Sequence, residues 1–248
     1  MIIESSQNKI VKLVKSLDTK KGMDKHNAFI IEGENYLDAV PPDKILHTVL
    51  SESYKGEKQG VVVSDSIFKS LSDTVNPQGI LTICEKMEYG LDVLDKANFI
   101  VALEELNDPG NLGTVIRTAK AAGVDVILAS KNTVDIYNKK VVRATAGAIF
   151  TMPIIQNIQL DTVLQRLKND GTKIICTHLK GNTEYYNVDL KQKICVVVGN
   201  EANGVSDGIA SIADYLVKIP MADGVESLNA SVATGVVLYE VVRQANCF

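Results

Sequence analysis

Three short polar segments, each set between apolar runs, contain the residues best suited to chemistry: 107–117, 198–205, and 219–221 with 226–233. They combine amides and glycines with Arg117 and Glu201 and contain neither cysteine nor histidine. This composition suits the binding of a polar organic cofactor and a hydroxyl-bearing substrate rather than a metal ion. Each segment follows an expected buried strand and precedes an expected helix, which is where ligands bind in an open α/β sheet.

The elements that would position these segments alternate regularly in the second half of the chain. Apolar strands that alternate with helices predict a parallel sheet covered on both faces. We expect strands at 99–103, 124–129, 173–177, 194–199 and 215–219, and helices at 111–122, 139–146, 160–169, 206–212 and 228–244. The last helix is apolar almost all round, so it fits either a central core helix or a helix that also packs against a partner subunit.

The first half of the chain predicts a smaller α/β unit. A helix is expected at 5–17 with Ser5 or Ser6 as its N-cap, followed by strands at 28–32, 44–50, 60–63 and 80–84. The following stretch, 85–97, is charged and only weakly periodic. We therefore expect an N-terminal domain over 1–85, a linker over 86–97 and a second domain over 98–248.

The composition is typical of a soluble protein. Of the 248 residues, 46% are hydrophobic and 23% are charged, and no run approaches the roughly 20 apolar residues of a membrane span. The first residues lack a basic stretch followed by an apolar one, so a signal peptide is not expected. The four cysteines form no C-x-x-C pair and are expected to be reduced and mostly buried in a cytoplasmic protein: Cys84, Cys176, Cys195 and Cys247.

Charge leaves the question of nucleic-acid binding open. The net charge of −4 argues against indiscriminate binding, because phosphate contacts need Lys and Arg. Residues 1–25 are nevertheless locally basic, and Lys9, Lys12 and Lys15 lie opposite the apolar face of the first predicted helix. From charge alone, this face fits either a solvated surface or an RNA contact.

The sequence lacks the motifs of several other enzyme classes. The G-x-G-x-x-G expected after the first strand of a dinucleotide-binding fold is missing, and so is the P-loop sequence G-x-x-x-x-G-K-[ST]. The histidines of the chain are His26, His47 and His178, none of them within the three polar segments, so we do not expect a hydrolase triad.

Taken together, the three polar segments resemble the signature motifs of the SpoU (TrmH-type) family of RNA 2′-O-ribose methyltransferases. The resemblance covers roughly 98–248, and the sequences at 6–9, 29–33 and 77–80 look like the family's N-terminal substrate-binding domain. It implies an α/β fold of the SPOUT type with a C-terminal trefoil knot, S-adenosyl-L-methionine as methyl donor, an RNA substrate and a homodimer formed through the C-terminal domain. The front domain resembles the branch that acts on ribosomal RNA, and the family implies neither a metal nor a membrane.

The resemblance also implies roles for individual residues. Arg117 stands where the family has its catalytic arginine. Because a guanidinium stays protonated, we expect it to hold an RNA phosphate and stabilise the developing alkoxide rather than act as a base. Asn111 fits an N-cap, a site-facing amide, or both. Glu201 is expected to orient another group of the site, and Asn229 and Ser227 to lie near the target nucleotide.

The donor is expected to be held largely by main-chain groups. The resemblance places five residues around it: Gly199, Ile219, Leu228, Met221 and Thr177. Arg143 lies in the stretch 135–148, which also looks familial, and is implied to meet RNA phosphate or the partner subunit. With Lys9, Lys12 and Lys15, it completes the candidate RNA-binding residues.

Some alternatives stay open. The family usually has an arginine near 22–24, where this chain has Met23, so the details of RNA docking are not fixed by the resemblance. The rival functions are a transfer-RNA 2′-O-methyltransferase, a non-catalytic RNA-binding protein with the same fold, and a small-molecule α/β enzyme that uses a nucleotide. The complete set of polar residues in the three segments argues against the non-catalytic alternative.

Overall fold

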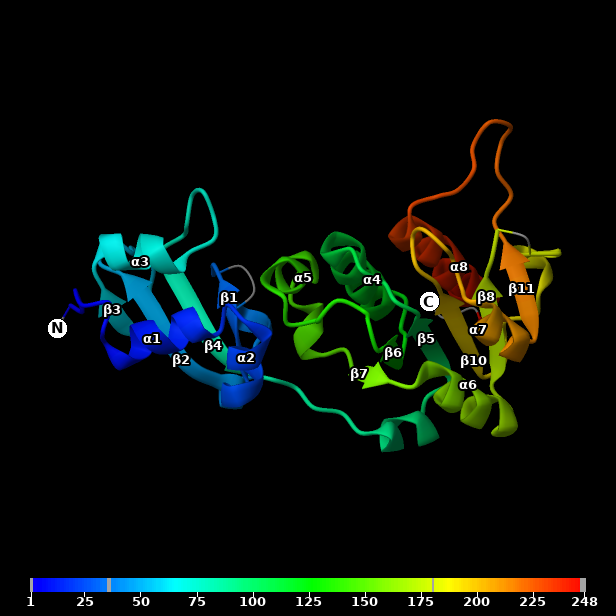
Figure 1. The fold of residues 1–248 in the computed structure, drawn as a ribbon, viewed down its shortest axis with the longest axis horizontal. Coiled ribbons are helices and arrows are strands. Elements are labelled where there is room, and N and C mark those ends of the chain that lie inside the picture. The colour runs from blue at the N-terminus through cyan, green and yellow to red at the C-terminus, as the bar shows by residue number, and fades with distance from the viewer. Residues whose placement is uncertain (1, 35–36, 180, 246–248) are drawn as a thin grey trace. The chain divides into compact units, whose positions relative to one another are not determined.

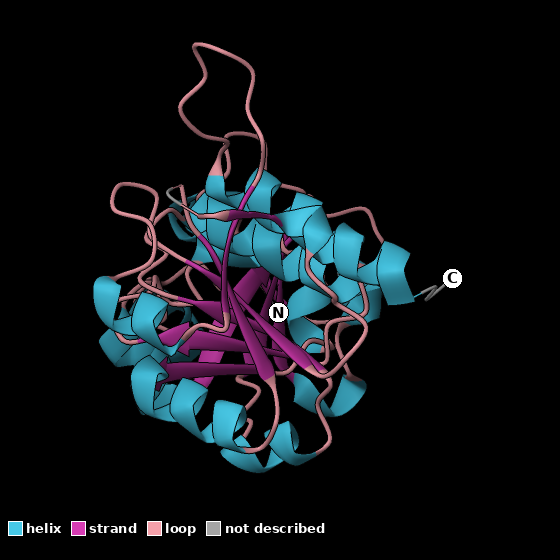
Figure 2. Ribbon diagram, turned by 90° about the vertical axis from the view of Figure 1, so that its right-hand side faces the viewer, coloured by secondary structure: helices cyan, strands magenta, loops and turns pink. Residues whose placement is uncertain are grey.

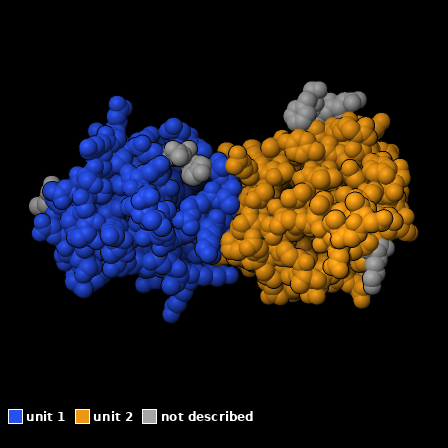
Figure 3. Space-filling model, turned by 90° about the horizontal axis from the view of Figure 1, so that it is seen from above, with its two compact units in different colours: residues 1–87, 137–150 blue, residues 88–136, 151–248 orange. Residues whose placement is uncertain are grey.

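The computed structural model describes residues 2–34, 37–179 and 181–245. They form two compact units, distinguished by colour in Figure 3: unit 1 comprises 1–87 and 137–150, and unit 2 comprises 88–136 and 151–248. The chain first leaves unit 1 within the predicted linker region. The return of 137–150 to unit 1 is a feature that the linear division of the sequence does not contain.

Unit 1 is built on a four-stranded mixed sheet in the order β1-β4-β2-β3 (Figure 1). β4 pairs antiparallel with β1 and β2, and β3 joins β2 in parallel. The strands are β1 (Ala28–Glu32), β2 (Ile45–Ser51), β3 (Val61–Val63) and β4 (Ile80–Glu85), with helices α1 (Lys9–Ser16), α2 (Lys20–His26) and α3 (Asp65–Leu71) and 3-10 turns η1 (Leu37–Ala39) and η2 (Pro42–Lys44). The four strands agree with the predicted ones to within one residue at each end.

The first helix is amphipathic as predicted but begins later. Its N-cap is Asn8, whose side-chain oxygen accepts a hydrogen bond from Ile10 N at 2.9 Å, so the prediction of Ser5 or Ser6 as the cap is wrong. An Asn at this position satisfies one of the free N–H groups of the first turn. Val11 and Val14 form the buried face of the helix, whereas the three predicted RNA-binding lysines of α1 are exposed.

The segment 137–150 contains α5 (Lys139–Ala144) and η4 (Ala148–Phe150) and packs within unit 1. The rings of Tyr137 and Phe150 lie 4.7 and 5.9 Å from that of Phe29, and Tyr137 donates to the carbonyl of Met87 at 2.7 Å. Lys139 forms ion pairs with Asp18 and Asp73 at 2.5 and 2.8 Å. Burial alone would lower the pKa of Lys139, but the two carboxylates raise it above its usual value, so the ammonium stays charged.

Unit 2 is a seven-stranded parallel sheet in the order β7-β6-β5-β10-β8-β11-β9, which confirms the predicted α/β class. Its strands are β5 (Phe99–Leu103), β6 (Val126–Ser130), β7 (Ile154–Ile158), β8 (Lys173–Thr177), β9 (Thr183–Glu184), β10 (Ile194–Val198) and β11 (Tyr215–Lys218). The helices are α4 (Pro109–Ala121), α6 (Leu160–Asn169), α7 (Asp207–Ile212) and α8 (Ala230–Ala245), with 3-10 turns η3 (Leu91–Asp95) and η5 (Tyr185–Asn187). β7 and β9 lie at the two edges of the sheet and were not predicted.

Helices cover both faces of this sheet, as Figure 2 shows. Ile100 and Cys195 point toward one face and form a core with Leu164 of α6 and Ile209 of α7. Residues of the opposite alternation, such as Val101 and the central β10 residue Val196, are also fully buried. That second face is covered by α8, which contacts both β10 and α4. Burial on both faces explains why the strands are continuous apolar runs.

The buried cysteines agree with the prediction. Cys84, Cys176 and Cys195 are free and buried, and burial raises the pKa of the Cys84 and Cys176 thiols to about 12. They are therefore inert thiols that pack as small apolar side chains. Cys247 lies outside the described residues.

Candidate active site

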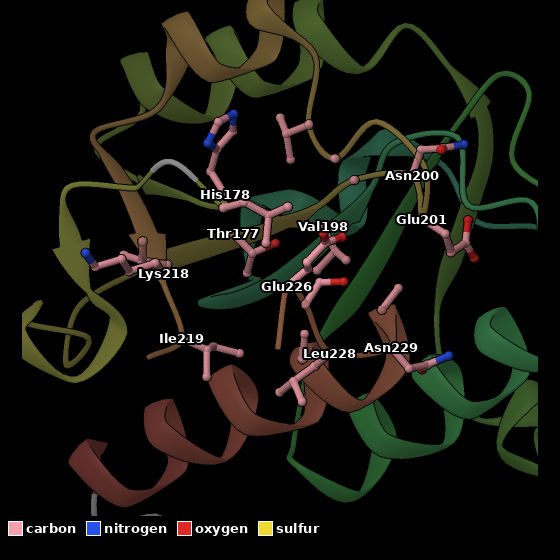
Figure 4. A pocket seen from close by; sticks show the side chains of 18 of the residues that line it. Thr177, His178, Val198, Asn200, Glu201, Lys218, Ile219, Glu226, Leu228 and Asn229 are labelled. Carbon is pink, nitrogen blue, oxygen red and sulfur yellow. The ribbon is translucent and has the colours of Figure 1, made fainter. Parts of the chain in front are cut away.

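A pocket of about 890 Å³ opens in unit 2 where β8, β10 and β11 end. Because parallel strands place their carboxyl ends at one edge of a sheet, the segments that follow them meet there. Figure 4 shows side chains from these segments around the cavity, with Thr177 and Val198 from strand ends and Ile219 and Leu228 from the third polar segment.

The second polar segment forms one wall as a tight backbone loop. Asn200 N donates to Gly204 O at 3.1 Å, and Gly204 N donates to Asn200 O at 2.8 Å. The Asn200 side chain accepts from Ala202 N at 2.7 Å and donates to Glu105 O at 3.0 Å. A Cβ on Gly199 would lie 2.1 Å from the backbone carbon of Gly204, so only glycine permits this close approach of two main-chain segments.

The third polar segment runs into the start of α8. Asn229 Oδ1 accepts from Ser231 N at 2.9 Å and from Ser231 Oγ at 2.7 Å, which satisfies donors of the first helical turn. Five residues of this segment that were expected at the site line the pocket: Ile219, Met221, Ser227, Leu228 and Asn229.

A line of hydrogen bonds connects all three polar segments. Asn229 Nδ2 donates to Asn111 Oδ1 at 2.8 Å, and Asn111 Nδ2 donates to Glu201 Oε1 at 2.9 Å. Asn229 and Glu201 line the pocket, whereas Asn111 stands in α4 and joins the two. We call Asn229, Asn111 and Glu201 the polar bridge. The convergence expected of the three segments is therefore present in the fold.

Asn111 is not the N-cap that was one of its expected roles. That position is taken by Asp108, whose carboxylate accepts from Asn111 N at 2.7 Å, and Pro109 follows in the first turn. The capping carboxylate leaves the Asn111 amide free to point toward the other two segments.

Arg117 lies elsewhere on α4. It is exposed, does not line the pocket, and its guanidinium has no hydrogen-bond or ion-pair partner among the described residues. The candidate RNA-binding residues do not line the pocket either: Lys9, Lys12, Lys15 and the half-buried Arg143 all belong to unit 1.

The remaining candidates around the donor are pocket residues. Gly199 and Thr177 line the cavity with Ile219, Leu228 and Met221. Four charged or polar pocket residues lie outside the three polar segments and were not expected at the site: His178, Glu184, Asp207 and Lys218. Lys218 and His178 follow or end a strand, so the rule that ligands bind beyond strand ends would have flagged them.

The size and lining of the pocket suit an organic ligand. Its volume falls within the roughly 300–1,000 Å³ typical of small-molecule sites, and its lining mixes apolar side chains with main-chain groups of glycine-containing loops. Within the described part of the chain, no group of three or more His, Cys, Asp or Glu residues could hold a metal ion. In the same residues, no helix has the length and apolar character needed to cross a membrane.

Known proteins with similar sequences match nearly the whole chain. Residues 98–239 match the SpoU rRNA Methylase family, and residues 8–82 match the MRM3-like substrate binding domain. A protein of Bacillus subtilis named 23S rRNA (guanosine(2553)-2′-O)-methyltransferase is 32% identical over 247 residues, which is 96% of this chain and 98% of that protein.

Solved structures agree with these matches. Crystal structures of an rRNA methyltransferase from Sinorhizobium meliloti, one of them bound to AdoMet, align with a TM-score of 0.84 and 31% identity over 98% of this chain and 97% of theirs. A tRNA-modifying TrmH/SpoU enzyme of A. aeolicus aligns with a TM-score of 0.55 and 32% identity, but it covers only 61% of this chain and 77% of its own.

Proposed function

The chain belongs to the SpoU rRNA methylase family, and we propose that its substrate is ribosomal RNA. It is an S-adenosylmethionine-dependent RNA methyltransferase that acts on a ribose 2′-hydroxyl. The structural observation that supports the methyltransferase activity is the polar bridge, which joins three distant segments beside a pocket of nucleoside size.

The residues of the pocket fit the donor. We propose that main-chain groups at Gly199, Ile219 and Leu228 bind its adenosine and methionine parts, with Met221 and Thr177 in the wall. The close approach of Gly199 to Gly204 supports this, because it packs two main-chain segments together in the lining of the pocket. When bound, S-adenosylmethionine supplies an electrophilic methyl group on a sulfonium.

The polar bridge is proposed to orient the target ribose. A side-chain amide has two N–H donors and two acceptor positions on its oxygen. Asn111 gives one N–H to Glu201 and accepts once from Asn229, so one donor and one acceptor position are left for a substrate hydroxyl. The Glu201 carboxylate fixes which way the Asn111 amide faces, and Ser227 adds a hydroxyl from the same rim.

Arg117 is proposed to act on the RNA side. Its guanidinium is exposed and unpaired among the described residues. A cation near the reacting oxygen would stabilise the negative charge that develops as the hydroxyl loses its proton. Its five N–H donors also suit a bidentate contact with a phosphate.

The presence of unit 1 supports ribosomal RNA rather than transfer RNA as the substrate. Residues 8–82 match a substrate-binding domain, and the similar tRNA-modifying enzyme covers 61% of this chain, against 98% for the rRNA methyltransferase. We propose that Lys9, Lys12 and Lys15, all exposed on α1, contact phosphates of the RNA, and that Arg143 adds a further contact. Such an enzyme would work in the cytoplasm, where both RNA and donor are found.

We also propose that the chain forms a homodimer through α8. Val232 and Tyr239 remain 52% and 46% exposed although they are large and apolar. Positions 232, 236 and 239 fall on one side of the helix, since they are four and three residues apart. Such a stripe on a helix that already packs against its own sheet supports a second subunit as its partner.

The strand order supports a trefoil knot in unit 2. β11 lies between β8 and β9, although those two strands are joined directly by residues 178–182. The last segment of the chain therefore enters a sheet position between strands that were already connected. We propose that α8, which follows β11, passes through the loop formed by that connection and the one from β9 to β10.

Labelled methyl transfer tests the function. Purified protein with [methyl-³H] S-adenosylmethionine should label ribosomal RNA stripped of 2′-O-methyl groups, and mapping the product should find one ribose position. Transfer RNA from the same cells is the matched control. Label in transfer RNA alone would overturn the assignment of the substrate. Donor binding without label in any RNA would support the non-catalytic alternative.

A further inference from the structure

The C-terminal end of α8 is hydrogen-bonded to the segment that joins β9 to β10. Gln244 Oε1 accepts from Leu190 N at 3.0 Å, and Gln244 Nε2 donates to Val188 O at 3.1 Å. One side chain thus satisfies a donor and an acceptor of the same loop. The side chains of Val188 and Leu190 are buried, with 4% and 2% exposed, so the loop is anchored on both its backbone and its apolar side.

A buried carboxylate holds Gln244 in this orientation. Glu240 Oε1 accepts from Gln244 Nε2 at 2.8 Å, and Arg243 donates to both Glu240 oxygens at 2.7 and 2.8 Å. The hydrogen bond from Arg243 is the main cause that lowers the pKa of Glu240; burial opposes it, and the Gln244 amide adds to it. Only 8% of the Glu240 side chain is exposed. Burying an ionised carboxylate costs free energy unless the carboxylate is fully hydrogen-bonded. Glu240 therefore keeps its hydrogen-bond partners Arg243 and Gln244 in place.

The loop bound by Gln244 is connected to the wall of the pocket through the strand that precedes it. It follows β9, whose Glu184 lines the cavity. β9 is two residues long, and among the described residues its strand partner is β11 alone, through Val217↔Thr183 and Lys218↔Glu184. Two residue pairs at the edge of a sheet give little stability by themselves, so the position of this wall depends on what holds the loop after it. β11 in turn ends at Lys218 and leads to Ile219, another pocket residue.

We propose that Glu240 and Gln244 are positioning residues for methyl-donor binding: through Val188 and Leu190 they hold β9, and with it the outer wall of the donor pocket, in place. The inference rests on the proposed function in one respect, that the donor occupies this pocket. Both ends of α8 then serve the site. Asn229 of the polar bridge caps the first turn of the helix, and the Glu240–Gln244 pair in its last turn holds the segment that follows β9.

The test is a set of substitutions read by donor binding. Q244L removes both loop hydrogen bonds at nearly constant size, and S-adenosylmethionine should then bind about tenfold more weakly, from the loss of two hydrogen bonds of ordinary strength. The KM for the donor should rise by a similar factor, while kcat and the KM for RNA stay within about twofold of the wild type. Amide hydrogen exchange should accelerate at residues 185–190 and remain unchanged at β5.

Two further variants separate positioning from general damage. Q165L is the matched control, because Gln165 is an exposed glutamine of α6 whose amide contacts only the Asn169 side chain; its donor affinity should equal that of the wild type. Q244E keeps the acceptor for Leu190 N but places a second carboxylate beside Glu240, and the E240Q/Q244E exchange should recover part of the lost affinity by removing that repulsion.

The outcomes are distinct. Donor affinity of Q244L within twofold of the wild type would overturn the proposal, and so would a parallel change in kcat, both KM values and thermal stability. A wild-type protein that does not bind S-adenosylmethionine would instead refute the proposed function. Weaker donor binding in Q244L, with partial recovery in the exchange variant, would establish the brace.

Discussion

Asn111 offers a sharp test of the polar bridge, because the substitution N111D exchanges its donor for an acceptor without a change of shape. Its Nδ2 lies 2.9 Å from Glu201 Oε1, so the variant would bring two carboxylates together. Two unit charges about 4 Å apart repel by about 1 kcal/mol in water and about 4 kcal/mol at an effective dielectric constant of 20. Asn111 is half-buried and Glu201 exposed, which places the penalty between these limits.

The magnitude follows from that repulsion and the lost hydrogen bond. Taken together they give about 2–4 kcal/mol, so kcat/KM of N111D should fall by about 30- to 1,000-fold. N111A loses the hydrogen bonds but adds no charge, and about 1–2 kcal/mol corresponds to a loss of about 5- to 30-fold. Donor affinity should change little in either variant, because Asn111 does not line the pocket.

The pH dependence distinguishes the two variants. When the pH falls, the two carboxyls of N111D can share one proton, which removes the repulsion and restores a hydrogen bond between them. Initial rates of methyl transfer, divided by the wild-type rate at each pH between 8 and 5, should therefore rise toward acid pH for N111D and stay flat for N111A. Parallel profiles for the two variants would refute the contact between Asn111 and Glu201 in the working enzyme.

The other predictions address the RNA side and the pocket wall. R117A should abolish methylation while donor affinity stays within about twofold, and an equal loss of both would contradict its assignment to the RNA. Replacing Lys9, Lys12 and Lys15 together by Gln should weaken RNA binding and reduce the slope of log K against log salt by about 0.7–0.9 per lost phosphate contact; an unchanged slope would mean that the face is only solvated. G199A should weaken donor binding more than tenfold, since its methyl group would lie 2.1 Å from the Gly204 backbone, whereas G208A, with its nearest neighbour at 3.9 Å, should behave as the wild type in calorimetric titration.

The sequence predicts the elements best where burial decides them. β5, β8 and α6 have the predicted bounds, because an apolar run buried on both faces and a helix with one apolar stripe each leave a clear pattern. The ends of α1 and α4 were misjudged, since Asn8 and Asp108 compete with neighbouring residues that are also good caps. The choice among such caps depends on side-chain geometry that local sequence does not contain.

The edge strands of the sheet and the packing of 137–150 in unit 1 could not be predicted from the sequence. β7 contains Gln156 and Asn157 within five residues, and β9 has only two residues, so neither shows a continuous apolar run. The stretch 137–150 reads as part of the second domain because it follows β6 in the chain, but Tyr137 and Phe150 find their aromatic partner in Phe29. Contacts between residues more than 100 positions apart leave no periodic signal.

The same limit applies to the site. The three polar segments could be identified because each follows a buried strand, and their convergence follows from the common edge of a parallel sheet. The pairing within the polar bridge could not be identified, since Asn111 lies 90 residues from Glu201 and 118 from Asn229. Gln244 was not singled out for a related reason: near the end of an apolar helix it reads as a surface residue, and only the fold brings Val188 and Leu190 to it.

The placement of Asn111 and Arg117 on one helix has a consequence for how the site is completed. Six residues advance an α-helix by about 9 Å and turn it by about 240°, so the two side chains leave the helix in different directions. Asn111 is hydrogen-bonded to two residues of the pocket, Glu201 and Asn229, whereas Arg117 is exposed and does not line the pocket. In the role proposed for it, Arg117 would contact the RNA from outside the pocket. In that role Arg117 would not take part in donor binding, which is why R117A should spare donor affinity and remove methyl transfer.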